Sequence, residues 1–221
     1  MTAKPSAPPH PARHPPRHPP RHPDVEILGE ETGFARHLGV DIVRFRHRLF
    51  AGGWSGERVF DVVRRGGAAA VILYDPERDS VVLVEQFRVA ALYAGRSPWQ
   101  VEAVAGLIDS DETPEAVARR EAREEANLDP LGPLLPIQTM MPATGSLDER
   151  VFLFCGRVDS RGAAGIYGLA AEQEDIRVLV KTVAEIETML DKGEIDSAHT
   201  LISLYWLLRH RDRLRKEWPG G

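Results

Sequence analysis

Three glutamates in one short stretch of the sequence have the chemistry to hold a divalent cation. Glu121, Glu124 and Glu125 stand at positions i, i+3 and i+4, so a helix would bring them onto one face. Like charges at this spacing repel, and each such pair costs an isolated helix about 0.2–0.5 kcal/mol. Mg²⁺ prefers carboxylate oxygens and would offset that cost, whereas the ordinary explanation of such a cluster is a solvated, charged helix face.

The residues around these glutamates predict the helix itself. Thr113 is a suitable N-cap, and Pro114 suits the first helical position, where its missing N–H would have no partner. Gly106 indicates a turn ahead of the helix, and Arg120 can offset part of the negative charge. Asn127 follows the helix, and asparagine tolerates the positive φ of a C-terminal turn. The sequence therefore predicts a glycine turn, a loop and a helix.

The spacing of these residues resembles the Nudix box, Gly-x5-Glu-x7-Arg-Glu-U-x-Glu-Glu-x-Gly-U, in which U is aliphatic. The matching positions are Gly106, Glu112, Arg120, Glu121, Ala122, Glu124, Glu125 and Leu128. One position departs, because Asn127 stands where the pattern has glycine. A metal held by such glutamates suits a substrate rich in phosphate oxygens, since it can neutralise a diphosphate and activate a water.

The whole chain has the size and composition of a soluble globular protein. It has 221 residues, a formal net charge of -5 and 28% charged residues, enough for one domain with a sizeable core. Mild acidity argues against a general nucleic-acid binder, and we expect no membrane span and no secretory signal. The single cysteine, Cys155, excludes an internal disulfide and should be buried in a strand, so we expect a cytoplasmic protein.

Composition divides the chain into three segments. Residues 1–23 repeat proline, histidine and arginine and have almost nothing to bury, so they predict a disordered tail rather than a histidine metal site. Residues 24–65 predict a small β lobe, with strands over 38–50 and 58–63. Residues 66–218 contain the box, and the resemblance implies that they form the Nudix hydrolase domain.

Periodicity within this domain predicts an α/β fold. The expected strands cover residues 68–74, 80–89, 100–105, 134–140, 150–158 and 176–181. Helices are expected over 183–192 and after a cap at Asp196 or Ser197. The last helix carries an apolar stripe that we expect in the core, namely Leu201, Leu204, Tyr205, Leu208 and Leu214.

From about residue 25 to residue 218 the chain resembles the bacterial ADP-ribose diphosphatase, or ADP-ribose pyrophosphatase, branch of the Nudix hydrolases. The resemblance is carried by residues 44–50, 84–88, the box, 168–178, 192–196 and 216–218. It implies the Nudix α/β/α sandwich with a small N-terminal β lobe. It also implies Mg²⁺-dependent cleavage of ADP-ribose to AMP and ribose 5-phosphate, with Mn²⁺ as a substitute, by a homodimer with exchanged N-terminal strands.

The resemblance assigns catalytic and metal-binding roles to particular residues. The backbone carbonyl of Ala105 with Glu121, Glu125 and Glu174 would bind metal, and Glu124 beside them joins this set. Glu172, in the acidic loop 168–175, matches the general base, which works within one hydrogen bond of a metal-polarised water. The ordinary explanation of that loop is a solvated surface segment. The catalytic set implied is Glu172, Glu121 and Glu125.

Four further residues are expected to contact substrate. Arg88, at the end of a strand, matches a diphosphate contact, although an exposed strand-end arginine is the ordinary explanation. Glu149, Leu107 and Arg58 complete this set with less support from the motifs. Arg120 is expected to orient the glutamates, and Glu112 to be structural.

The departures from the family concern adenosine recognition. The position of the aromatic that stacks on adenine falls on His37, with Phe34 nearby, and Phe60 stands where an arginine is expected. The loop 141–149 is longer than in the family. These positions leave open another nucleoside diphosphate sugar, such as GDP-mannose. A non-catalytic nucleotide sensor is a second alternative, against which the intact glutamates argue.

Overall fold

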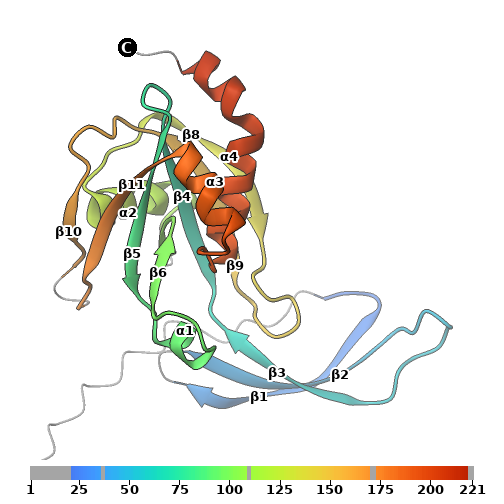
Figure 1. Cartoon of the computed structure of the whole chain (residues 1–221). Coiled ribbons are helices and arrows are strands. Elements are labelled where there is room, and N and C mark those ends of the chain that lie inside the picture. Colours follow the sequence, from blue (N-terminus) through green and yellow to red (C-terminus); the bar gives the residue numbers. More distant parts are fainter. Residues whose placement is uncertain (1–20, 36–37, 109–110, 170–172, 219–221) are drawn as a thin grey trace, which may run out of the picture. The chain divides into compact units, whose positions relative to one another are not determined.

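The computed structural model describes residues 21–35, 38–108, 111–169 and 173–218 (Figure 1). Its contacts divide the chain into two compact units. The N-terminal unit comprises residues 1–66 together with 143–149, and the core unit comprises residues 67–142 and 150–221. The expected tail lies outside the described residues except for its last three positions. Among the helices described, none combines the length and the apolar character that crossing a membrane requires.

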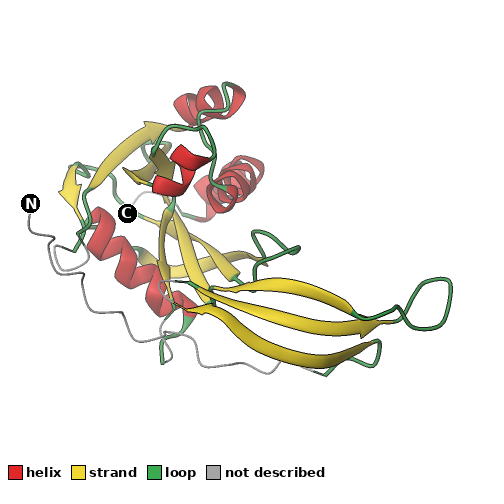
Figure 2. Ribbon diagram, turned by 90° about the horizontal axis from the view of Figure 1, so that it is seen from below, coloured by secondary structure: helices red, strands yellow, loops and turns green. Residues whose placement is uncertain are grey.

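The described part of the N-terminal unit forms a three-stranded antiparallel sheet, seen as long yellow strands in Figure 2. The strands follow the order β1 (Val25–Ala35), β2 (Gly39–His47) and β3 (Arg58–Arg64). The predicted strand over 58–63 is confirmed, whereas that over 38–50 is too long. β2 ends at His47 because a turn follows, in which Gly52 and Gly53 take φ values of 91° and 79°.

The core unit is built on an eight-stranded mixed sheet. Its path is β10-β11-β5-β4-β9-β8, with β6 paired to β5 and β7 paired to β4. Strand bounds are β4 Gly67–Asp75, β5 Ser80–Phe87, β6 Trp99–Glu102, β7 Val104–Leu107, β8 Leu131–Met140, β9 Arg150–Arg157, β10 Gly165–Tyr167 and β11 Ile176–Thr182. The helices are α1 Val89–Tyr93, α2 Pro114–Ala126, α3 Val183–Asp191 and α4 Ala198–Glu217.

Both faces of this sheet are covered by helices. Along β4, Val71 and Leu73 pack in a cluster with α2, and the intervening Ile72 and Tyr74 pack with α3 and α4. This alternation follows from the two-residue period of a strand, and a strand buried on both faces reads as a continuous apolar run. The predicted α/β sandwich is therefore confirmed, with α2 on one side and α3 and α4 on the other (Figure 1).

Several element boundaries differ from the prediction. β5 ends at Phe87 and α1 begins at Val89, so the strand expected over 80–89 is too long. The strand expected over 100–105 is two strands, because β6 pairs with β5 and β7 pairs with β4. The short elements α1 and β10 were not predicted. Cys155 is buried in β9, as expected, and burial raises the pKa of its thiol.

The prediction that the apolar stripe of α4 lies in the core is partly wrong. Leu204 and Leu214 are fully buried, and Leu201 and Leu208 pack against the same cluster, but Tyr205 is 57% exposed. The buried face of α4 includes Thr200, Ser203 and Leu207. Because two of the residues on this buried face carry hydroxyl groups, the spacing of the apolar residues alone did not identify the face correctly.

Candidate active site

The local sequence positions α2 as predicted. The hydroxyl of Thr113 accepts a hydrogen bond from the backbone N–H of Ala116 at 3.3 Å, and Pro114 opens the helix. Asn127 takes φ 51° and ψ 38°, the left-handed conformation that the box usually assigns to glycine. The buried face of α2 consists largely of small residues, which lets the helix lie close to the sheet.

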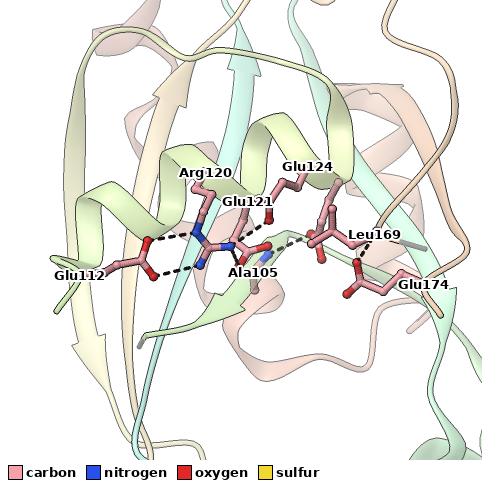
Figure 3. A network of polar contacts seen from close by, with 8 residues as sticks. Ala105, Glu112, Arg120, Glu121, Glu124, Leu169 and Glu174 are labelled. Carbon is pink, nitrogen blue, oxygen red and sulfur yellow. Dashed lines mark hydrogen bonds and ion pairs between the residues drawn. The ribbon is translucent and has the colours of Figure 1, made fainter. Parts of the chain in front are cut away.

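Arg120 holds three glutamates on one side of the helix, as Figure 3 shows. Its Nε lies 3.0 Å from Oε1 of Glu112, and its Nη1 lies 2.8 Å from Glu121 and 2.9 Å from Glu124. Hydrogen bonds to Glu112 and the charge of Glu121 raise the pKa of Arg120 further, so the guanidinium stays charged. These contacts agree with the expectation that Arg120 orients the box glutamates.

Among the acidic side chains of the box, Glu125 has the least positive charge nearby to balance its own. It is 3% exposed and accepts a hydrogen bond from the backbone N–H of Ala105 at 3.2 Å. Burial and then the charge of Glu121 raise the pKa of Glu125 to about 8. Burial also raises the pKa of Glu121 to about 7, although Arg120 opposes this. Two neighbouring carboxyl groups thus resist ionisation near neutral pH.

Gly106 leaves the space that Glu121 occupies. A Cβ at Gly106 would stand 1.8 Å from Oε1 of Glu121, far inside any contact distance. Gly106 lies in β7, directly after Ala105, and is paired with Ala69 of β4. The glycine of the box therefore serves a close approach between strand and helix rather than a turn of positive φ.

The acidic loop contributes a third carboxylate. Glu174 accepts a hydrogen bond from the backbone N–H of Leu169 at 3.0 Å (Figure 3). Its negative charge is among the causes that raise the pKa values of Glu121 and Glu125, so it lies within electrostatic reach of both. Gly168, with φ 110°, leaves room for the Glu174 side chain. Glu172, the expected general base, lies outside the described residues.

Arg88 lies on the same side of the core unit. It precedes α1, and its Nε and Nη2 lie 2.9 and 2.8 Å from one carboxylate oxygen of Glu102. Its positive charge works to lower the pKa of Glu125, which places Arg88 within electrostatic reach of the box. Leu107 is half-buried in β7. Sequence reasoning missed Glu102, whose signal was a carboxylate among apolar residues of a predicted strand.

The remaining predicted substrate contacts belong to the N-terminal unit. Nη1 of Arg58 lies 3.4 Å from Nε2 of His47, and Glu149 lies 3.7 Å from Nε of Arg65. Phe60 is exposed in β3, and His37 lies outside the described residues. The roles of Arg58 and Glu149 at the site stay predictions.

The residues of α2 and β7 fit a hard divalent cation. Within the described residues no three acidic, histidine or cysteine side chains already form a ligand cluster. However, Glu121 and Glu125 are held close together with raised pKa values and without enough positive charge to balance both. A divalent cation supplies that charge, and carboxylate and carbonyl oxygens are the ligands that Mg²⁺ accepts. Glu124, by contrast, is paired with Arg120.

Comparisons with known proteins agree with this geometry. The chain is 43% identical over 195 residues, covering 88% of this chain and 93% of the relative, to "ADP-ribose pyrophosphatase" of Escherichia coli strain K12. It is 34% identical over 148 residues, covering 66% of this chain and 76% of the relative, to "GDP-mannose pyrophosphatase" of Citrobacter koseri. A crystal structure of an ADP compounds hydrolase shares the fold, with a TM-score of 0.67, 18% identity, and coverage of 91% of this chain and 100% of that one.

A family model described as the NUDIX domain matches residues 64–207. This match includes α2, its glutamates, Arg88 and the acidic loop. The chain belongs to the NUDIX family.

Proposed function

We propose that this protein is a Mg²⁺-dependent hydrolase that cleaves the diphosphate bond of ADP-ribose to give AMP and ribose 5-phosphate. The observation that carries the proposal is the under-compensated carboxyl pair of half-buried Glu121 and buried Glu125, of which Glu125 lies within electrostatic reach of Arg88. The substrate follows from the Escherichia coli relative, which is named an ADP-ribose pyrophosphatase and aligns with 88% of this chain.

The metal would be held by the carbonyl of Ala105 and by the carboxylates of Glu121, Glu125 and Glu174. When bound, Mg²⁺ or a substituting Mn²⁺ neutralises the diphosphate and makes water a better nucleophile. Arg120 keeps Glu121 oriented and pairs with Glu124, so Glu124 has the weaker claim to a direct metal contact. Exclusion of water around Glu125 strengthens each of these electrostatic interactions.

The substrate diphosphate would lie against Arg88, because a guanidinium binds phosphate oxygens through paired hydrogen bonds. Leu107, Arg58 and Glu149 are proposed to contact the rest of the substrate. Glu172 is proposed as the general base that accepts the proton of the attacking water. The variant Glu172→Gln should lower kcat about 100-fold while metal affinity changes by less than about threefold. A kcat close to that of the wild type would place the base elsewhere.

We also propose a homodimeric assembly with exchanged N-terminal strands, in which the N-terminal unit forms the interface. Its sheet leaves several large apolar side chains exposed, namely Val25, Ile27, Leu28, Phe34, Val59 and Phe60. Several large exposed apolar side chains on one small sheet favour an interface. We propose residues 24–65 as the dimerisation lobe, residues 66–218 as the hydrolase domain and residues 1–23 as a dispensable tail. The proposed location is the cytoplasm, which suits the single buried thiol of Cys155.

The experiment is hydrolysis of a panel of diphosphate compounds by the full chain, with and without Mg²⁺ or Mn²⁺. The panel contains ADP-ribose, GDP-mannose, NADH and diadenosine polyphosphates, and chromatography separates the products. Fast, metal-dependent formation of AMP from ADP-ribose is the expected result. Preference for GDP-mannose would keep the chemistry and change the substrate. Binding of ADP-ribose without turnover of any compound would support a nucleotide sensor instead.

A further inference from the structure

Glu102 is a buried carboxylate in the core unit to which the proposed function assigns no role. Glu102 is 7% exposed and is the last residue of β6. Arg88 donates to one of its oxygens from Nε at 2.9 Å and from Nη2 at 2.8 Å. Both contacts use the side of the guanidinium formed by Nε and Nη2. Within the described residues Nη1 makes no hydrogen bond or ion pair, so the edge formed by Nη1 and the second N–H of Nη2 remains available to an anion.

The pairing of β5 with β6 places this ion pair on the face of the sheet that α2 covers. Glu102 is the cross-strand partner of Val84, and Gln86 is the partner of Gln100. Directly paired side chains share a face, and Val84 packs in the cluster that contains the buried residues of α2. Arg88 continues the two-residue alternation from Val84. Glu102 and Arg88 therefore lie on the side of the sheet that carries the box glutamates.

The first turn of α4 holds the backbone next to Glu102. The hydroxyl of Thr200, which is 0% exposed, accepts a hydrogen bond from the backbone N–H of Ala103 at 2.9 Å. His199 lies within electrostatic reach of both members of the ion pair: burial lowers its pKa, Glu102 opposes this shift and Arg88 adds to it. Among the described residues, Arg88 is the side chain that donates hydrogen bonds to the Glu102 carboxylate. The Glu102 carboxylate is thus paired with Arg88, and the hydrogen bond from Ala103 to Thr200 fixes the backbone beside it.

We propose that Glu102 is a positioning residue that fixes the guanidinium of Arg88, so that its free edge meets the diphosphate of the substrate. An arginine side chain has many rotamers, and one held in advance loses less freedom when it binds an anion. This inference rests on the proposed function for the identity of the ligand. The placement of Arg88 by Glu102 is a property of the protein alone, so it can be tested separately.

A double-mutant cycle tests the role of Glu102 in the reaction. Glu102→Gln removes the charge but keeps the shape, and it should raise KM for ADP-ribose about tenfold while kcat changes less, because Arg88 binds substrate and transition state alike. In an Arg88→Ala background the same change should alter kcat/KM less than about twofold. Independent, multiplicative effects of the two changes would overturn the proposal.

A matched control separates this role from a loss of stability. Asp79 pairs with Arg211 elsewhere in the core unit, where the carboxylate side chain is 22% exposed against 10% for Glu102. Asp79→Asn should lower the melting temperature as Glu102→Gln does but leave KM unchanged. An equal rise of KM in both variants would show that the effect of Glu102 is structural.

A measurement on the free protein remains informative if ADP-ribose is not the substrate. The ¹⁵N-bound Hε of Arg88, assigned by its loss in Arg88→Lys, should exchange slowly with solvent in the wild type. In Glu102→Gln it should exchange at least about tenfold faster, because its acceptor is weakened. Equal exchange rates would overturn the positioning role. Failure to hydrolyse ADP-ribose, with the exchange difference intact, would overturn only the proposed function.

Discussion

Two pairs of acidic residues in the core unit are at least partly buried, but their pKa values shift in opposite directions. Burial works to raise the pKa of Asp75, yet hydrogen bonds from the hydroxyl and N–H of Ser160, at 2.7 and 2.9 Å, outweigh it and lower the pKa. Burial acts in the same way on Asp79, where Arg211 and Tyr74 lower the pKa. At Glu121 and Glu125 the hydrogen bonds from Arg120 and from the backbone N–H of Ala105 do not outweigh burial, and the pKa values rise to about 7 and about 8.

The comparison separates structural acids from acids that serve a ligand. At the β4–β5 turn the hydrogen bonds to the two carboxylates outweigh the cost of burying them, so their charge contributes to the stability of the fold. At the box, charge is held in place without full compensation, which costs stability in the free protein. A site that destabilises its own charges binds a cation more strongly than one that neutralises them internally.

The largest expected effect is on catalysis by Glu125→Gln. Turnover should fall by about three orders of magnitude, because a metal ligand beside the reacting groups is lost. The melting temperature of the metal-free variant should equal or exceed that of the wild type, since an uncompensated carboxyl group is removed. The measurements are kcat for ADP-ribose hydrolysis and calorimetric melting without metal.

The stability gain of this variant depends on pH with a defined sign. Because the pKa of Glu125 rises from 4.5 in the unfolded chain to about 8 in the folded one, its contribution favours folding below pH 4.5 and is lost as pH rises toward 8. The melting temperature of Glu125→Gln should therefore exceed that of the wild type by the largest margin at pH 8 and by the smallest at pH 5. A reverse trend would contradict the raised pKa, and unchanged turnover would remove Glu125 from the metal set.

A second prediction concerns the space beside the box rather than its charge. Gly106→Ala puts a Cβ 1.8 Å from the present position of Glu121 Oε1, so the carboxylate must move. We expect kcat/KM to fall about 100-fold, since small displacements of a catalytic group have effects of this size. Gly56→Ala, at a glycine with nothing within 4 Å of the added Cβ, is the control. Equal activity of the two variants would show that Glu121 needs no fixed position.

At the other acidic pair the expected effect is on stability alone. Asp79→Asn weakens bonds from Arg211 and Tyr74 and should cost about 2 kcal/mol of unfolding free energy at pH 7. The folded pKa of Asp79 lies below the unfolded value of 3.8, so its contribution is present above that pH and disappears as pH falls through the folded pKa. Urea denaturation of the wild type and the variant at pH 7 and pH 3 measures how much stability Asp79 contributes at each pH. A loss of catalytic activity in Asp79→Asn would contradict the assignment of Asp79 to stability alone.

Local signals explain how much of the site could be predicted from the sequence. The cap at Thr113, the left-handed Asn127 and the shared face of the box glutamates each depend on a few neighbouring residues. The sandwich followed from apolar runs such as β4. Boundaries set by pairing with other strands, such as the end of β5 at Phe87, were placed wrongly.

The signs of the pKa shifts depend on partners far along the chain. Ser160 lies 85 residues from Asp75 and Arg211 lies 132 residues from Asp79, so neither pairing has a local signature. Glu102 was missed for the same reason, because its partner Arg88 reaches it only through the β5–β6 register. The spacing of acidic residues along a helix therefore predicts which of them lie close together. It does not predict which of them are paired with hydrogen-bond donors or positive charges.

The smallest expected effect is the most direct measure of the difference between the two pairs. At pH 7 a carboxyl group with a pKa of about 8 and one of about 7 hold protons for much of the time. Binding of Mg²⁺ requires them ionised, so it should release about one proton into the buffer. Titration calorimetry in buffers of different ionisation enthalpy counts this proton. Asp79→Asn should release as much as the wild type, and Glu125→Gln should release clearly less. Binding heats that do not depend on the buffer would show that Glu121 and Glu125 are already ionised in the metal-free protein, in which case the box would be as well compensated as the β4–β5 turn.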